Sequence, residues 1–124
     1  MKVLFVTRGF PSDKDPMLGN YEAVQAKAIA AKGHEVSVLA ICWRNLLHVL
    51  CNKKVKCRVV DGIRIYECDR IKISIPHIYF PNLELWAQKW QFKKVYNKYV
   101  QELGTPDVVH AHIIMYAAPA TCLK

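Results

Sequence analysis

Residues 2–41 read KVLFVTRGFPSDKDPMLGNYEAVQAKAIAAKGHEVSVLAI and decide the fold of this chain. The stretch begins with an apolar run from Lys2 to Thr7, which is typical of a strand buried on both faces. A loop with two prolines follows over residues 8–16, and a second apolar run, Glu35 to Ile41, ends the stretch. The order strand, loop, helix, strand predicts one parallel unit of an α/β sheet.

The helix between these two strands has clear signals at both ends. Gly19-Asn20 opens it, and apolar residues at helical spacing follow, most of them alanine, the best helix former. Lys32-Gly33 closes it, and we expect Gly33 to adopt the left-handed conformation that ends many helices.

The rest of the chain supplies a hairpin, a long helix and a further strand. Asp61-Gly62 lies between two alternating runs over residues 58–67, which predicts a β-hairpin. Leu83 to Leu103 is the longest helix candidate, ended by Gly104 and Pro106. Its predicted apolar stripe consists of Leu83, Trp86, Trp90, Val95, Tyr99 and Leu103. Residues 107–111 are predicted to form the next strand.

Two segments have weaker patterns. Trp43 to Leu50 is interpreted as a short helix, and Ile71 to Pro81, with its prolines, as a loop or an edge strand. The order of elements predicts an α/β fold with a Rossmann-like parallel sheet flanked by helices. We expect residues 3–6, 36–39 and 108–111 to be neighbouring parallel strands of one domain that spans residues 1–124.

Composition narrows the class of protein. The chain is 52% hydrophobic, as in an ordinary globular protein, and its net charge of +8 favours anionic partners without choosing among them. It has no apolar run of 18 residues, and the run at its N-terminus is too short for a signal peptide, so we expect a cytoplasmic protein. The five cysteines lack CxxC spacing, so we expect reduced thiols and no metal site, with Cys42 and Cys68 packed as small apolar groups.

The first candidate site is the loop that leads into the first helix. Unpaired backbone N–H groups and the positive end of the helix dipole attract anions there. Gly19, followed by Asn20, has no Cβ and would allow a ligand to approach its backbone closely. On this interpretation Gly19→Val weakens anion or acceptor binding with little loss of fold. The alternative is a flexible helix start without a ligand.

The second candidate site is the pair His110 and His112. The two are two residues apart on a strand, so both side chains point to one face. Histidines at a strand end can shuttle protons, donate hydrogen bonds to a phosphate or bind a metal. The alternative is one buried and one exposed histidine without a role, and the spacing does not decide between them.

The long helix carries tryptophans and lysines together. Trp86 and Trp90 stand near four lysines, namely Lys89, Lys93, Lys94 and Lys98. A basic helix with tryptophans can lie at a membrane interface, and here it would give weak contact with anionic lipid. Packing of the stripe on the sheet is the preferred interpretation, because the sheet needs a cover. The aromatic spacing does not favour nucleic acid as a partner.

The chain resembles the N-terminal domain of GT-B glycosyltransferases, specifically the glycosyltransferase family 4 group. The resemblance lies in Lys2–Pro11, Gly19–Glu22, Gln25–Ala40, Asp61–Tyr66 and Pro106–His112. It implies the truncated N-terminal half of a GT-B fold, which binds the acceptor, whereas a C-terminal domain absent from this chain binds a nucleotide sugar. The reaction moves a sugar to a glycan or lipid-linked acceptor with retention, usually without a metal or other cofactor.

The resemblance carries over to few residues. Gly19, His110 and His112 match family positions, and Asn20 stands where the family commonly has a second glycine in its first loop. It assigns no catalytic residue here, since the family's catalytic histidine and donor carboxylates are expected beyond Lys124. The chain alone is therefore expected to catalyse no transfer and to bind nucleotide sugar weakly. Because many members of this group act on lipid-linked acceptors, the cytoplasmic protein is expected to be peripheral to the inner face of the membrane. The alternative function is a non-catalytic α/β binding or regulatory module.

Overall fold

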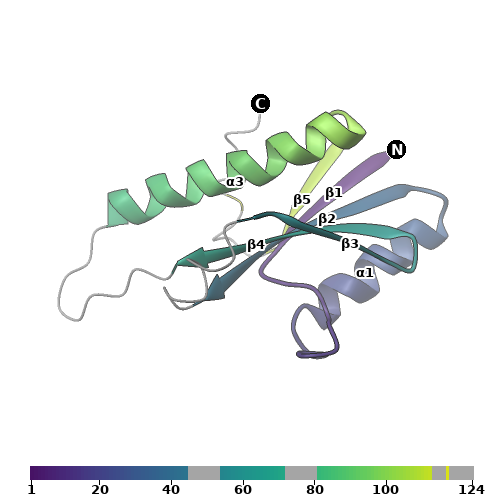
Figure 1. Ribbon diagram of the computed structural model, residues 1–124. Coiled ribbons are helices and arrows are strands. Elements are labelled where there is room, and N and C mark those ends of the chain that lie inside the picture. The colour runs from purple at the N-terminus through teal and green to yellow at the C-terminus, as the bar shows by residue number, and fades with distance from the viewer. Residues whose placement is uncertain (45–53, 72–80, 113–116, 118–124) are drawn as a thin grey trace.

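The computed structural model describes residues 1–44, 54–71, 81–112 and 117 (Figure 1). The helices are α1 (Asn20–Ala31) and α3 (Pro81–Leu103). The strands are β1 (Lys2–Thr7), β2 (Glu35–Arg44), β3 (Lys56–Val60), β4 (Ile63–Ile71) and β5 (Val108–Ala111). The described residues therefore form a small α/β domain with one sheet and two helices.

The five strands form one mixed sheet in the order β3-β4-β2-β1-β5. β1 pairs in parallel with β2 on one side and with β5 on the other, and β4 continues the parallel pairing beyond β2. Among the strands that the structure describes, only the edge strand β3 is antiparallel. The prediction that the strands at residues 3–6, 36–39 and 108–111 are parallel neighbours is confirmed, with β1 in the middle.

The two helices cover opposite faces of this sheet (Figure 1). Because alternate side chains of a strand point to opposite faces, β1 contributes to two cores. Val3 and Phe5 pack with the α1 side, while Leu4 and Val6 pack with Phe92, Val95 and Tyr99 of α3. Central strands buried on both faces explain the nearly continuous apolar runs in the sequence.

The predicted hairpin joins β3 to β4. Asp61 and Gly62 form its two-residue turn, and both have positive φ, 51° and 79°. Such a turn needs two residues that tolerate the left-handed region, which is why Asp-Gly is so strong a signal. Gly33 ends α1 with a φ of 85°, as the sequence predicts.

Two element boundaries differ from the sequence predictions. Trp43 and Arg44 do not begin a helix but extend β2, because they pair with Arg70 and Ile71 of β4. Residues 45–50 of the expected short helix lie outside the described residues, as do residues 72–80 of the expected loop or edge strand. α3 begins at Pro81, where proline is tolerated because the first helical N–H groups have no intrahelical partner.

Candidate functional site

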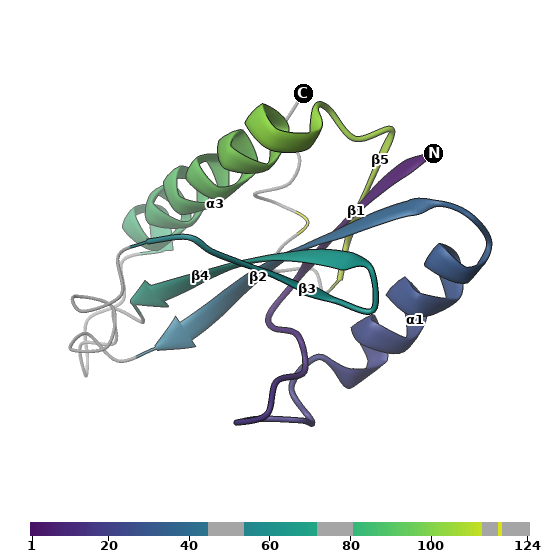
Figure 2. The ribbon, with the colours of Figure 1, turned by 45° about the vertical axis from the view of Figure 1, so that its right-hand side comes forward.

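The sheet order points to one place for a ligand. The four parallel strands follow one another along the chain as β1, β2, β4 and β5. Across the sheet their order is β4-β2-β1-β5, so β2 and β4 lie on one side of β1 and β5 lies on the other. The chain therefore changes direction across the sheet between β1 and β5. In open α/β sheets, ligands bind outside the carboxyl ends of the strands at such a switch point. Here that place holds the loop after β1 and the residue after β5 (Figure 2).

The loop after β1 is held by its own polar groups. Thr7 is fully buried, and its hydroxyl donates to the carbonyl oxygen of Gly9 at 2.8 Å. Ser12 and Asp15 exchange two backbone hydrogen bonds, of 3.1 and 3.2 Å, around a tight turn. The carboxylate of Asp15 then accepts from the backbone N–H of Leu18 at 3.2 Å. These bonds give the segment between β1 and α1 a defined shape.

Arg58 fastens this loop to the hairpin. Its guanidinium donates to the carbonyl oxygens of Phe10 at 3.1 Å and Pro11 at 2.8 Å, and it pairs with the Glu67 carboxylate at 2.7 Å. The guanidinium carbon also lies 5.9 Å from the centroid of the Phe10 ring, a cation–π contact. No local sequence pattern predicts this anchor, because Arg58 and the loop are far apart in the chain.

Gly19 is required by packing and by backbone conformation. It precedes α1 with a φ of 72°, a region that residues with a Cβ rarely adopt. A Cβ at this position would collide with the carbonyl oxygen of Gly9. The space beside Gly19 is therefore filled by the backbone of the loop, and the expectation that Gly19→Val costs little fold is wrong. Asn20 follows as the first residue of α1, with its side chain exposed.

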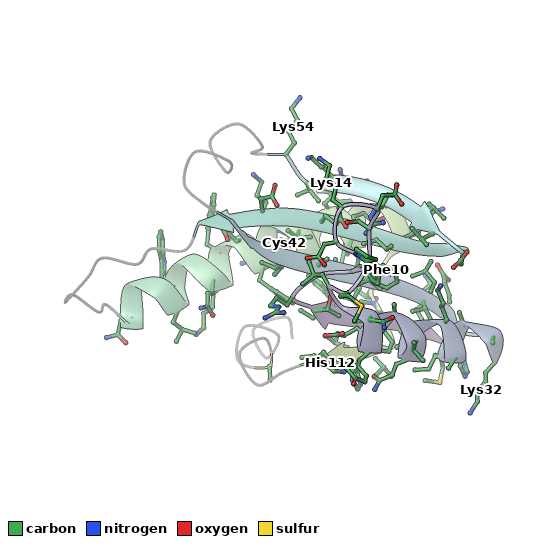
Figure 3. All side chains as sticks on the ribbon, turned by 90° about the horizontal axis from the view of Figure 1, so that it is seen from below. Phe10, Lys14, Lys32, Cys42, Lys54 and His112 are labelled. Atoms are coloured by element: carbon green, nitrogen blue, oxygen red, sulfur yellow. The ribbon has the colours of Figure 1, made fainter. Side chains whose placement is uncertain are left out.

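His112 meets the first turn of α1. Its Nδ1 lies 3.5 Å from Oε1 of Glu22, and the two side chains are 26% and 11% exposed. The backbone N–H of His112 donates to the carbonyl oxygen of Val6 at 2.8 Å, which continues the β1–β5 ladder by one residue. Figure 3 shows His112 beside α1, seen from below the sheet. The structure thus brings the end of β5 to the helix start that follows Gly19.

His110 and His112 point to the same face, as their spacing predicts. Their ring centroids lie 5.8 Å apart, and the ring of His110 lies 4.9 Å from that of Phe5, on the α1 side of the sheet. His110 is exposed and His112 is half-buried. The alternative of a fully buried member of the pair therefore does not describe this site.

Glu22 is the member of this site that the sequence analysis missed. It is buried in the first turn of α1, where a carboxylate interacts favourably with the positive end of the helix. Its place three residues after Gly19 is the usual position of an acidic residue at a helix start, and that spacing is the signal that could have identified it.

The chemistry of the site follows from the side chains of Glu22, His110 and His112. A carboxylate accepts hydrogen bonds from hydroxyl groups, and an imidazole can accept or donate one according to its protonation. Across residues 1–44, 54–71, 81–112 and 117, no three His, Cys, Asp or Glu side chains are grouped so as to hold a metal ion. A carboxylate with two imidazoles can therefore exchange hydrogen bonds with the hydroxyl groups of a ligand.

No protein-family model matches this chain, and no curated protein matches it. In the described part of the chain, no helix is long and apolar enough to cross a membrane. The fold and the site define a small α/β domain with a mostly parallel five-stranded sheet and polar side chains at the switch between β1 and β5.

Proposed function

We propose that this chain is the Rossmann-like acceptor-side domain of a retaining GT-B glycosyltransferase. In the full-length protein a second domain would bind the nucleotide sugar, and the sugar would pass to a hydroxyl of a glycan or lipid-linked acceptor. The order of the parallel strands supports this proposal, because it matches the first half of a doubly wound dinucleotide-type fold. The resemblance to that glycosyltransferase group supports it independently, and it lies in Lys2–Pro11, Gly19–Glu22, Gln25–Ala40, Asp61–Tyr66 and Pro106–His112.

The observation that carries the proposal is the pair formed by Glu22 and His112. The two groups lie 3.5 Å apart at the switch between β1 and β5, where ligands of such sheets bind. A carboxylate at the start of α1 repels the phosphates of a nucleotide-sugar donor by like charge, and it accepts hydrogen bonds from sugar hydroxyl groups. This chemistry favours the acceptor on this side of a cleft and the nucleotide on the other.

The proposal gives the residues of this site different roles. Glu22 and His112 hold acceptor hydroxyl groups, and the exposed His110 extends the polar surface beside them. Gly19 and Asn20 shape the start of α1 beside these side chains. Stabilisation of the departing nucleotide diphosphate needs positive groups opposite this site, and we assign those to the second domain.

Calorimetric titration of the 124-residue chain tests the proposal. The probes are neutral methyl glycosides and disaccharides on one side and UDP-glucose and GDP-mannose on the other. The proposal predicts saturable binding of at least one neutral glycoside and weaker binding of both nucleotide sugars. Micromolar or tighter binding of a nucleotide sugar would place the donor site on this chain instead. Absence of saccharide binding would favour a non-catalytic binding or regulatory module.

A further inference from the structure

The outer face of α3 exposes two large aromatic side chains. Trp86 and Trp90 are 65% and 59% exposed, although the sequence analysis assigns both to the stripe that packs on the sheet. Val95 and Tyr99 of the same predicted stripe are buried against the sheet, together with Phe92, and they lie on the opposite side of the helix from the two tryptophans. Two large indole rings one helical turn apart therefore face solvent.

Lysines surround these tryptophans on the same face. Lys89, Lys93 and Lys94 are all exposed and lie three or four residues from a tryptophan. The ammonium nitrogen of Lys94 lies 5.9 Å from the centroid of the Trp90 ring. From residue 86 to residue 101 the sequence contains four lysines and no acidic residue. The face therefore combines apolar rings with positive charge.

Lys98 does not belong to this face. Its ammonium group donates to the carbonyl oxygen of Val55 at 3.3 Å, and the residue is half-buried. This contact ties α3 to the segment before β3, so the basic residues of the outer face are Lys89, Lys93 and Lys94.

We propose that this outer face, formed by Trp86, Lys89, Trp90, Lys93 and Lys94, binds the surface of an anionic lipid bilayer. Indole rings are favoured at the level of the headgroups, where their apolar area leaves water and their N–H stays hydrogen-bonded. The lysines provide the charge complementary to anionic headgroups. α3 would lie in the plane of the interface, with its buried face still on the sheet.

Nucleic acid fits this face less well than lipid. The face has lysines and no arginine, and arginine is the residue best suited to bidentate contacts with phosphates. Single-stranded nucleic acids stack on aromatic rings set along a basic groove, whereas here the rings stand on the outside of a helix. The proposal does not rest on the glycosyltransferase assignment, because Glu22 and His112 lie on the other side of the sheet.

Vesicle co-sedimentation with the 124-residue chain tests the proposal. The vesicles contain phosphatidylcholine alone or phosphatidylcholine with phosphatidylglycerol at about one lipid in three. We expect binding to the anionic vesicles at low salt, weaker binding at physiological salt and little binding to phosphatidylcholine alone. Lys93→Gln/Lys94→Gln should lower the partition coefficient by roughly twenty-five-fold at low salt, from about a fivefold loss per lysine. Trp86→Ala/Trp90→Ala should lower it by about tenfold or more.

Matched variants on the opposite side of the sheet are the controls. Tyr21→Ala removes an aromatic ring that is 83% exposed, and Lys14→Gln/Lys32→Gln removes two exposed lysines (Figure 3). Both should bind vesicles like the wild type, apart from a small loss from the lower net charge. Equal effects of the two lysine pairs would overturn the proposal, because they would indicate attraction by net charge alone. Failure to sediment with anionic vesicles, or tighter binding to oligo-dT than to vesicles, would overturn it as well.

Discussion

Oε1 of Glu22 and Nδ1 of His112 lie 3.5 Å apart and join the first turn of α1 to the end of β5. The contact exists because β5 is the direct neighbour of β1, so the chain after β5 and the loop after β1 leave the sheet side by side. The two residues are far apart in the sequence, so no local pattern predicts that they meet. The ligand site proposed for this chain depends on this pair.

Substitution of Gly19 should destabilise the fold rather than act on binding alone. We expect Gly19→Ala to lower the free energy of unfolding by about 3 kcal/mol or more, because the new Cβ meets the carbonyl of Gly9 and φ is positive. Gly33→Ala is the matched control, since Gly33 also has positive φ, 85°, but nothing lies within 4 Å of a Cβ there. Its cost should be about 1 kcal/mol. Urea unfolding measures both, and equal losses would contradict the packing role of Gly19.

Removal of Arg58 should loosen the loop between β1 and α1. Arg58→Ala deletes the bonds to the carbonyls of Phe10 and Pro11 and leaves Glu67 without its partner. We expect a loss of about 2–3 kcal/mol and faster hydrogen exchange at the Asp15 and Leu18 amides, which are bonded within the loop. Lys56→Ala, an exposed change on the same strand, is the control. Unchanged exchange in the loop of Arg58→Ala would show that the anchor is dispensable.

Alkaline pH should unfold the protein through its buried tyrosines. Burial, and then the hydrogen bond to Glu102, raises the pKa of Tyr66, and burial raises the pKa of Tyr99. A phenol with a higher pKa in the folded chain contributes its full stabilisation below about pH 10, where unfolded tyrosine begins to ionise. That contribution is lost as the pH rises from there to the folded pKa. Stability measured by urea unfolding should therefore fall above about pH 10.

Tyr66→Phe separates this effect from general alkaline damage. At neutral pH the variant should lose about 1 kcal/mol, because its ring no longer donates to Glu102 at 2.7 Å. Above about pH 10 its stability should fall less steeply than that of the wild type. Tyr21→Phe, at an exposed position, should match the wild type throughout. Equal slopes for the wild type and Tyr66→Phe would rule out Tyr66 as a source of the pH dependence.

The sequence predicted the parts of the fold that depend on local signals. Apolar runs predicted β1 and β2. Asp61-Gly62 predicted the hairpin, and Gly33 predicted the end of α1. These features follow from backbone conformation and from burial on both faces of a sheet, and both leave local patterns in the sequence. The parallel neighbours of β1 followed from the same patterns.

The features that the sequence did not predict depend on contacts between distant segments. The extension of β2 to Arg44 comes from its pairing with β4. The periodicity of α3 could not show which apolar residues face the sheet, because tryptophan, phenylalanine and tyrosine occur on more than one side of the helix. The Arg58 anchor also joins distant parts of the chain. The site loop was identified, but the packing role of Gly19 required the position of Gly9.

The most direct test of the central claim is nuclear magnetic resonance mapping of a bound glycoside on the ¹⁵N-labelled chain. With the best neutral glycoside from calorimetry, the amides of Asn20, Glu22 and His112 should shift together, and Val59 on the edge strand should not. Glu22→Gln, whose spectrum would first confirm the fold, should weaken binding by about tenfold. Shifts confined to other surfaces, or unchanged affinity in Glu22→Gln, would contradict an acceptor site at the switch between β1 and β5.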